Sequence, residues 1–207
     1  MLCFCNTTTF LTSKTLSVNM AKIPSNANKV FNGILYDVYH YDQKMFDGTT
    51  QTFEMLKRKP SVQVIPIKDG KIIMAHEEQP GTKEFTTFVG GCSESDEEPL
   101  VAAKRELLEE TGLTSDDWEL IFPLEIPGRI DWDIHFYAAR GCTQIQEVAA
   151  NNGEKITLKE LSFDEFIEFT KRDDFRNKVF KSHMAKFDYD QEKINHLKAK
   201  LSLISDE

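Results

Sequence analysis

Residues 91–113 constrain the fold of this 207-residue chain most strongly, because they predict one helix with defined ends. Ser95 and Glu98 have the spacing of a capping box, and the proline that follows suits the first turn of a helix. Gly112 can end the helix in a left-handed conformation. We therefore expect a helix over residues 96–111.

One face of the expected helix carries three glutamates. Glu106, Glu109 and Glu110 stand at positions i, i+3 and i+4, which places their carboxylates side by side. Like charges at this spacing destabilise a helix by roughly a few tenths of a kcal/mol, whereas a bound cation would stabilise it. Oxygen ligands on adjacent turns suit Mg²⁺. An apolar stripe beside the carboxylates is expected to pack on a sheet: Leu100, Ala103 and Leu107.

Arg105 and Glu97 occupy fixed positions relative to these carboxylates. Arg105 precedes Glu109 by four residues, so an ion pair can orient that carboxylate. The alternative interpretation is a solvated acidic face on a surface helix. That alternative explains neither the glycines at the two ends, Gly91 and Gly112, nor the spacing of Glu97 and Arg105.

With these residues the segment resembles the Nudix box, G-x5-E-x7-R-E-U-x-E-E-x-G-U with U a bulky aliphatic residue, and every specified position is filled. The resemblance implies an α/β fold, a Nudix-type α/β/α sandwich with a mixed sheet, an N-terminal β-hairpin region and C-terminal helices. The metal ligands that it implies are Glu106, Glu109, Glu110 and the backbone carbonyl of Gly90. The supporting residues that it implies are Glu97, Arg105, Gly91 and Gly112.

The same resemblance implies an enzyme, a Nudix pyrophosphohydrolase with Mg²⁺ as cofactor and Mn²⁺ as a substitute. The wider chain is similar to the branch that hydrolyses ADP-ribose or related nucleotide sugars to a nucleoside monophosphate and a sugar phosphate. Two alternatives stay open: a house-cleaning nucleoside triphosphate pyrophosphatase and a non-catalytic Nudix-like ligand sensor. Intact glutamates argue against the sensor, because such a module would be expected to lose them.

The flanking segments match this branch in part. Pro127 and Gly128 precede an expected strand, as the branch commonly has there, although a Pro-Gly pair is also an ordinary turn. The branch often has a Gln-Tyr-Arg segment and a Glu-Leu-Pro-Ala-Gly run into the box. Here residues 79–81 read Gln-Pro-Gly and residues 87–91 read Thr-Phe-Val-Gly-Gly, without that arginine and that glutamate. The substrate within the branch therefore stays open.

Members similar to ADP-ribose pyrophosphatases often take a general base from a loop downstream of the box. Glu147 and Glu154 are the candidate catalytic glutamates here. Both lie in the polar stretch 144–155, where an Asn-Asn-Gly sequence favours a mobile loop, and such loops commonly carry catalytic groups. Each could instead be a solvated surface residue.

Aromatic and arginine side chains outside the box are candidates for substrate binding. Phe53 and Trp132 could stack on a nucleobase, and Arg58 or Arg129 could bind a phosphate, because rings and guanidinium groups suit those partners. Most aromatic residues pack in protein cores, so a core role is the alternative for each ring.

Strands are expected around the acidic helix. Asp-Gly turns predict two hairpins, 30–41 with 49–58 and 62–67 with 71–75. The further expected strands are 118–122, 133–138 and 155–159. Ser162 and Glu165 form a capping box for a helix that ends near Lys171, and apolar spacing predicts helices in 175–187 and 191–201.

One catalytic domain fits this order of elements. Its predicted division is a disordered tail over 1–28 and a Nudix domain over 29–207. Within that domain we expect the following parts: the N-terminal hairpin 29–58, the catalytic core 59–170 and the C-terminal helices 171–207.

Charge and cysteine content limit the partners and the compartment. The net charge of −9, without a long basic cluster, disfavours nucleic-acid binding, so a small-molecule nucleotide is the expected partner. No apolar run is long enough to span a membrane. Four cysteines without a paired motif fit a cytoplasmic protein. A homodimer is expected only by analogy, because the N-terminal strands of this branch often exchange between subunits.

Overall fold

The computed structural model describes five stretches of the chain: residues 22–94, 96–125, 128–147, 155–186 and 189–203. Four sets of predicted features lie outside the described residues: the tail residues 1–21, Ser95, Pro127 and Glu154. Within the described stretches, none of the helices has the length and apolar character needed to cross a membrane.

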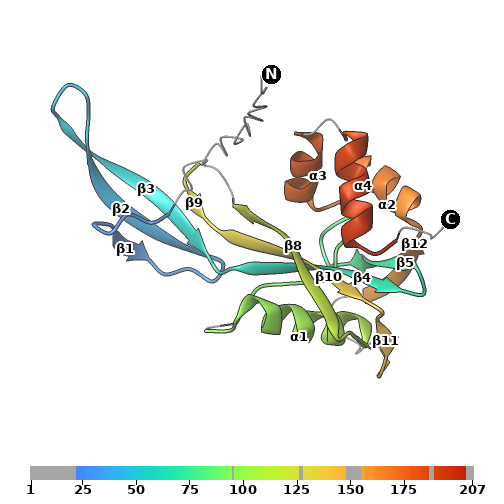
Figure 1. Ribbon diagram of the computed structural model, residues 1–207. Coiled ribbons are helices and arrows are strands. Elements are labelled where there is room, and N and C mark those ends of the chain that lie inside the picture. Colours follow the sequence, from blue (N-terminus) through green and yellow to red (C-terminus); the bar gives the residue numbers. More distant parts are fainter. Residues whose placement is uncertain (1–21, 95, 126–127, 148–154, 187–188, 204–207) are drawn as a thin grey trace, which may run out of the picture.

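A central mixed sheet is the middle layer of the fold (Figure 1). Its strands are β4 Ser61–Lys68, β5 Lys71–Glu78, β6 Phe85–Thr87, β8 Asp117–Glu125, β10 Asp133–Arg140 and β12 Lys155–Leu161. They follow the order β12-β5-β4-β10-β8, and β6 pairs with β5. The sheet is mixed because β10 runs parallel to β4, whereas β10 and β8 are antiparallel.

The predicted hairpin of β4 and β5 is confirmed. Asp69 and Gly70 form its turn with positive φ angles of 50° and 73°, as a two-residue turn of type I′ requires. Pairing of Ile67 with Ile72 sets the register. The sequence did not predict β6, because three residues are too few to show an alternating pattern.

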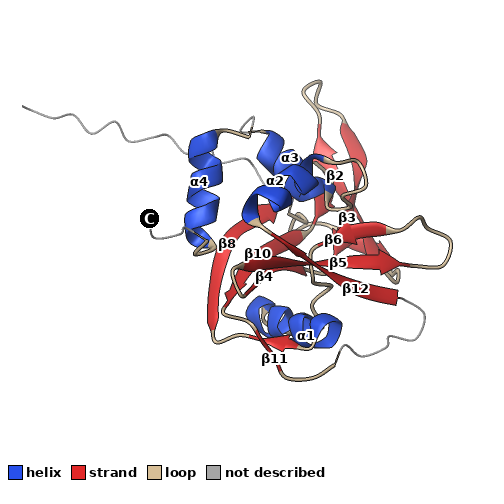
Figure 2. Cartoon of the chain, turned by 90° about the vertical axis from the view of Figure 1, so that its right-hand side faces the viewer, coloured by secondary structure: helices blue, strands red, loops and turns tan. Residues whose placement is uncertain are grey.

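Helices cover both faces of the sheet, which confirms the predicted α/β/α sandwich (Figure 2). One face carries α1 Pro99–Thr111, and the other carries α2 Phe163–Lys171, α3 Lys178–Ala185 and α4 Gln191–Lys200. Each interface has its own apolar core. The core under α1 includes Leu107, Val62 and Val64, and the opposite core is rich in phenylalanine, with Phe88, Phe136 and Phe180 fully buried.

The start of α1 corrects the sequence prediction. The helix begins at Pro99, and its N-cap is Glu98, for which the described residues show no side-chain capping bond. Glu98 is extended, with ψ 140°, because the proline that follows disfavours the helical conformation before it. Asp96, predicted as helical, has a left-handed φ of 63°. The predicted end is confirmed, since Gly112 terminates α1 with φ 67°.

The buried face of α1 also differs in part from the predicted stripe. Ala103 and Leu107 are buried as expected, together with Ala102 and Thr111. Leu100 is exposed, because it lies in the first turn at the edge of the contact with the sheet. A small sheet follows the helix, made of β7 Leu113–Thr114 and β11 Thr143–Gln144.

The N-terminal strands form an arm that extends away from the sandwich (Figure 1). Its strands are β1 Asn28–Phe31, β2 Tyr36–Lys44, β3 Thr50–Arg58 and β9 Ile130–Asp131. The predicted single strand 30–41 is two strands, because the chain turns sharply at Gly33. A Cβ atom there would lie 2.2 Å from the carbonyl oxygen of Tyr36. The predicted tail includes residues 22–28, yet Lys22 forms an ion pair with Asp131 of β9 at 3.2 Å.

The C-terminal helices pack on the phenylalanine-rich core. The capping box of Ser162 and Glu165 begins α2 as predicted. The next helix starts later than expected, at Lys178, because the Asn177 side chain caps it. Residues 175–177 are therefore not helical, which corrects the prediction. Leu197 of α4 is buried as its spacing suggested.

Candidate active site

Arg105 of α1 is the hub of the acidic cluster. Its guanidinium donates to Glu97 through Nε at 3.1 Å and Nη2 at 3.0 Å, a bidentate pair. Nη1 donates to Glu106 at 2.9 Å and to Glu109 at 3.1 Å, and Nη2 also reaches the carbonyl oxygen of Cys92 at 3.3 Å. The predicted ion pair between Arg105 and Glu109 is confirmed.

These contacts change the acidity of the groups that make them. The hydrogen bonds from Arg105 lower the pKa of Glu97, and the hydrogen bonds to Glu97 raise the pKa of Arg105. Glu106 behaves differently: burial raises its pKa, and Arg105 only partly opposes this effect. An additional positive charge beside Glu106 would therefore be favourable.

The glycines before α1 leave space for two of the carboxylates. A Cβ atom on Gly91 would lie 2.5 Å from Oε1 of Glu106, so a larger residue there would displace that carboxylate. Gly90 has a φ of 143° and donates its backbone N–H to Oε2 of Glu110 at 2.9 Å. The loop of Gly90 and Gly91 thus lies directly against Glu106 and Glu110.

Among the described residues, no three His, Cys, Asp or Glu side chains converge closely enough to hold a metal ion. Each of these carboxylates already has a protein partner: Arg105 pairs with Glu106 and Glu109, and the backbone N–H of Gly90 donates to Glu110. The donors still fit a hard divalent cation, because they are carboxylate oxygens on adjacent turns of one helix.

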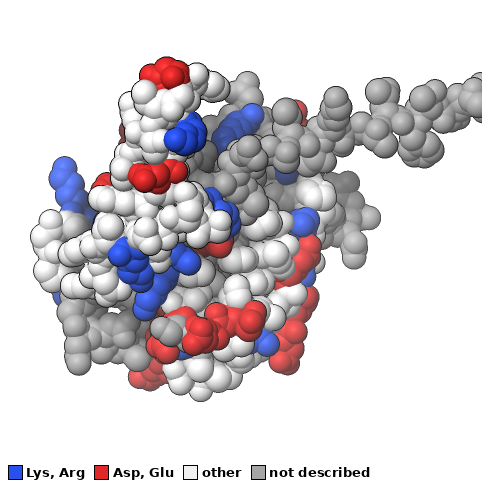
Figure 3. All heavy atoms as spheres, turned by 90° about the vertical axis from the view of Figure 1, so that its left-hand side faces the viewer, with Lys and Arg blue, Asp and Glu red and all other residues white. Residues whose placement is uncertain are grey.

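A cavity of about 430 Å³ opens beside this loop. It is lined by residues of the box and by side chains from several distant elements. Among the lining residues are Gly90, Gly91, Glu110, Arg58, Trp132, Glu77, Gln79, Phe85 and Arg176. Figure 3 shows acidic and basic side chains gathered close together on one face of the molecule. The cavity therefore connects the carboxylates to arginines, which suits an anionic ligand.

Two of the predicted substrate-binding residues meet in this cavity. The guanidinium of Arg58 lies 4.1 Å from the ring centroid of Trp132, and the ring nitrogen of Trp132 donates to the hydroxyl of Ser61 at 3.0 Å. The described residues that line the cavity include neither Phe53 nor Arg129. Those two form a separate pair, with the Arg129 guanidinium 4.7 Å from the Phe53 ring.

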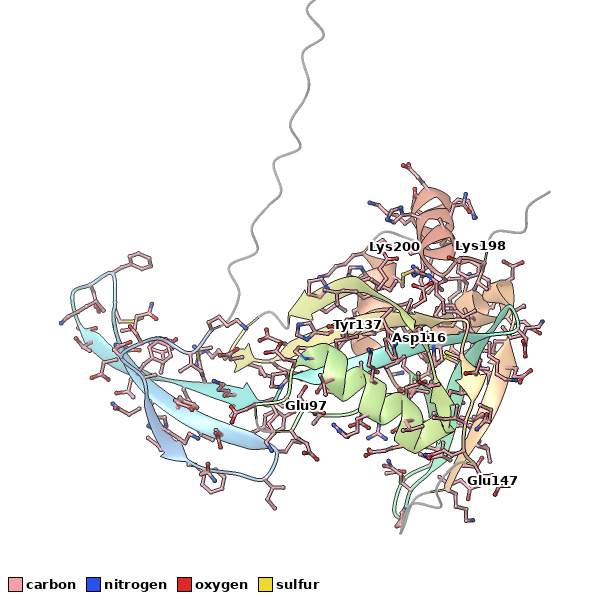
Figure 4. All side chains as sticks on the ribbon, turned by 60° about the horizontal axis from the view of Figure 1, so that its bottom comes forward. Glu97, Asp116, Tyr137, Glu147, Lys198 and Lys200 are labelled. Carbon is pink, nitrogen blue, oxygen red and sulfur yellow. The ribbon has the colours of Figure 1, made fainter. Side chains whose placement is uncertain are left out.

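One of the two candidate bases, Glu147, lies near the other end of α1. Glu147 is exposed and is not among the described residues that line the cavity. The preceding residue, Gln146, is tied to that end, since its side chain donates to the carbonyl oxygen of Leu108 at 3.3 Å. Figure 4 shows Glu97 and Glu147 toward opposite ends of α1. The second candidate, Glu154, lies outside the described residues.

Several residues of the cavity wall are not predicted from the sequence. Glu77 lies near the end of β5, Gln79 directly follows that strand, and Phe85 begins β6. Arg176 comes from the segment before α3. None of these residues belongs to a local motif. The single signal in the sequence is Gln79, which stands in a segment that matches the branch in part.

Comparisons with known proteins agree with this geometry. A family model described as "NUDIX domain" matches residues 57–183. A "Methanol dehydrogenase activator" of Bacillus methanolicus is 32% identical over 147 residues, which cover 69% of this chain and 80% of that protein. An "ADP-ribose pyrophosphatase" of Bacillus subtilis (strain 168) is 31% identical over 143 residues, with 68% and 72% covered.

A solved structure described as "Crystal structure of ADP compounds hydrolase" shares the fold, with a TM-score of 0.64. It is 19% identical in sequence, and the match covers 82% of this chain and 94% of that chain. The chain belongs to the NUDIX family and is a Nudix hydrolase. The resemblance to the ADP-ribose branch is likewise confirmed by the second relative.

Proposed function

We propose that the protein hydrolyses the diphosphate linkage of ADP-ribose or a related nucleotide sugar. Water attacks one phosphorus, the bridging P–O bond breaks toward the other phosphate, and a nucleoside monophosphate and a sugar phosphate leave. The observation that carries this proposal is the cavity in which Glu110 of the box meets arginine and tryptophan side chains. Such a cavity joins a candidate metal site to partners for phosphate and a base.

The proposed cofactor is Mg²⁺, with Mn²⁺ as a substitute. Glu106, Glu109 and Glu110 would hold it, together with the backbone carbonyl of Gly90. A divalent cation at such a site neutralises diphosphate charge and lowers the pKa of an attacking water. Arg105 would orient the glutamates, because its guanidinium donates hydrogen bonds to both Glu106 and Glu109.

The roles of the other predicted site residues follow from their contacts and from the lining of the cavity. Glu97 supports the cluster by holding Arg105, and Gly91 and Gly112 supply the shapes of the two flanking loops. Arg58 and Trp132 would bind a phosphate and a base inside the cavity. Glu147 or Glu154 would serve as the general base if the loop over residues 144–155 brings one of them to the substrate.

A homodimer is part of the proposal. The arm exposes large apolar side chains, which would be covered by a second copy of the chain. The exposed residues are Val30, Phe31, Ile34, Leu35 and Phe46. In such a dimer Phe53 and Arg129 could approach the partner's cavity. Sedimentation equilibrium would give a dimer mass, and a monomer mass would contradict the proposed homodimer.

A cytoplasmic location and the absence of a nucleic-acid partner complete the proposal.

A panel of substrates tests the function directly. The protein is incubated with Mg²⁺ and ADP-ribose, other nucleotide sugars, dinucleoside polyphosphates or oxidised nucleoside triphosphates, and the products are identified. Turnover of ADP-ribose to AMP and ribose 5-phosphate is expected. Release of pyrophosphate from triphosphates alone would favour the house-cleaning alternative, and tight binding without turnover would favour the sensor.

A further inference from the structure

The cavity has a second arginine, which comes from the C-terminal part of the chain. The guanidinium of Arg176 lies 4.0 Å from the ring centroid of Phe85, and its Nη1 donates to Oε1 of Gln79 at 3.3 Å. All three side chains line the cavity. The cavity therefore carries two arginine–aromatic pairs, this one and the pair of Arg58 with Trp132.

The backbone around Arg176 is fixed to the catalytic core. Its N–H donates to the carbonyl oxygen of Thr86 at 3.1 Å, and the preceding Phe175 is fully buried. The following Asn177 donates through Nδ2 to Oε1 of Gln63 at 2.7 Å. Contacts on both sides and through the backbone hold Arg176 in one place, so its position beside the cavity is built into the fold.

The two pairs lie on different sides of the cavity. Trp132 directly precedes β10, whereas Phe85 is in β6, which pairs with β5. In the sheet, β4 separates β5 from β10. The loop of Gly90 runs along β4, since Val64 pairs with Val89, and Gly90 holds Glu110 there. The candidate reaction centre therefore lies between the two pairs.

The chemistry of the Arg176 side suits a sugar phosphate. Arg176 offers a planar set of donors for phosphate oxygens. Glu77 adds a carboxylate that is 7% exposed and accepts from Nε2 of Gln79 at 3.0 Å, and carboxylate and amide groups suit sugar hydroxyls. The other side, with Trp132 and Arg58, has the larger planar surface for a nucleobase.

We infer that Arg176 is a specificity-determining residue that binds the sugar-phosphate half of the substrate, while the Arg58 and Trp132 pair binds the nucleoside half. This inference rests on the proposed hydrolysis of a nucleotide sugar. It assigns a role in substrate selection to the segment before α3, a role that the box itself does not provide. Residues 79–81 have no arginine of their own, so Arg176 supplies the cation beside Gln79.

The test compares Arg176→Ala with Arg172→Ala. Arg172 is a matched control, because it also lies over a phenylalanine ring, Phe169 at 5.1 Å, yet it pairs with Asp174 and is not among the described residues that line the cavity. The measurements are kcat and KM for ADP-ribose with Mg²⁺, and equilibrium binding of AMP and of ribose 5-phosphate by calorimetry in EDTA.

Arg176→Ala is expected to raise KM for ADP-ribose by about ten- to hundredfold, the effect of losing a charge-assisted hydrogen bond. It is also expected to weaken ribose 5-phosphate binding and to leave AMP binding unchanged. Arg172→Ala should match the wild type. Arg176→Lys keeps the charge and should recover part of the lost affinity for ribose 5-phosphate. Unchanged AMP binding in the alanine variant distinguishes this loss from a folding defect.

Equal KM values for the two alanine variants would overturn the inference and leave the proposed function intact. Loss of AMP binding in Arg176→Ala, with ribose 5-phosphate binding unchanged, would also overturn it, because the two halves would then be assigned the wrong way round. If the wild type hydrolyses no nucleotide sugar, the proposed function is wrong and the inference fails with it.

Discussion

The acidic side of the cavity and the wall around Arg176 are built in different ways. The acidic side comes from one helix and the loop before it, so Glu97, Arg105 and Glu106 meet through short-range spacing. The wall around Arg176 joins residues from β5, β6 and the segment before α3. Under the proposed roles, the chemistry of this hydrolase is encoded locally, whereas the selection of its substrate depends on how distant segments pack.

Removal of metal ions is the strongest test of the acidic side. With excess EDTA we expect turnover of ADP-ribose to fall by more than about a thousandfold. EDTA would remove the divalent cation from the carboxylates, and the charge of the diphosphate would then no longer be neutralised. Mg²⁺ should restore the rate and Mn²⁺ should substitute for it. Full activity in EDTA, measured by AMP release, would contradict the proposed metal site.

A change of one carboxylate should have the next largest effect. Glu110→Gln removes a charge that faces both Gly90 and the cavity, and kcat is expected to fall at least about a hundredfold while the melting temperature stays unchanged. Glu98→Gln is the matched control, since Glu98 is exposed at the start of the same helix. Equal rates in the two variants would remove Glu110 from the site.

The loop before α1 gives a smaller effect. Gly91→Ala places a methyl group 2.5 Å from the present position of Oε1 of Glu106, so the carboxylate must move. We expect activity to drop roughly ten- to hundredfold, as when a catalytic group is misplaced. The Mg²⁺ concentration for half-maximal rate should rise as well. An unchanged metal requirement would show that Glu106 does not need this space.

The smallest expected effect concerns stability at low pH. The pKa of Glu97 lies below its ordinary value of 4.5 because Arg105 donates hydrogen bonds to it. Its contribution to stability is therefore complete above about pH 4.5 and is lost as the pH falls through the lower pKa of the folded state. Glu97→Gln should flatten this part of the pH dependence.

Thermal melts of the wild type and Glu97→Gln between about pH 3 and pH 6 measure this difference. The wild type should lose melting temperature more steeply than the variant as the pH falls. Parallel curves would mean that the bidentate pair with Arg105 adds no pH-dependent stability, and the support assigned to Glu97 would then be unnecessary.

The contrast between the two sides also explains which predictions held. The end of α1 at Gly112 and the pair of Arg105 with Glu109 were predictable, because both depend on residues within one or two helical turns. The turn of Asp69 and Gly70 was predictable for the same reason. Local geometry is enough to specify each of these features.

Tertiary contacts account for the errors. The helix α1 begins at Pro99 and not at residue 96, because the proline disfavours a helical conformation of the residue before it. Residues 175–177 were expected in a helix, yet Phe175 pairs with β6 through Thr86. That pairing places Arg176 at the cavity, and no local pattern could indicate it, because the two segments are far apart in the sequence.

The central claim is that the glutamates of α1 serve the hydrolysis of a nucleotide-sugar diphosphate. The most direct measurement is product analysis after incubation of wild type and Glu110→Gln with ADP-ribose and Mg²⁺. The expected result is equal amounts of AMP and ribose 5-phosphate from the wild type and almost none from the variant. Absence of both products with the wild type, or equal yields from the two proteins, would contradict the claim.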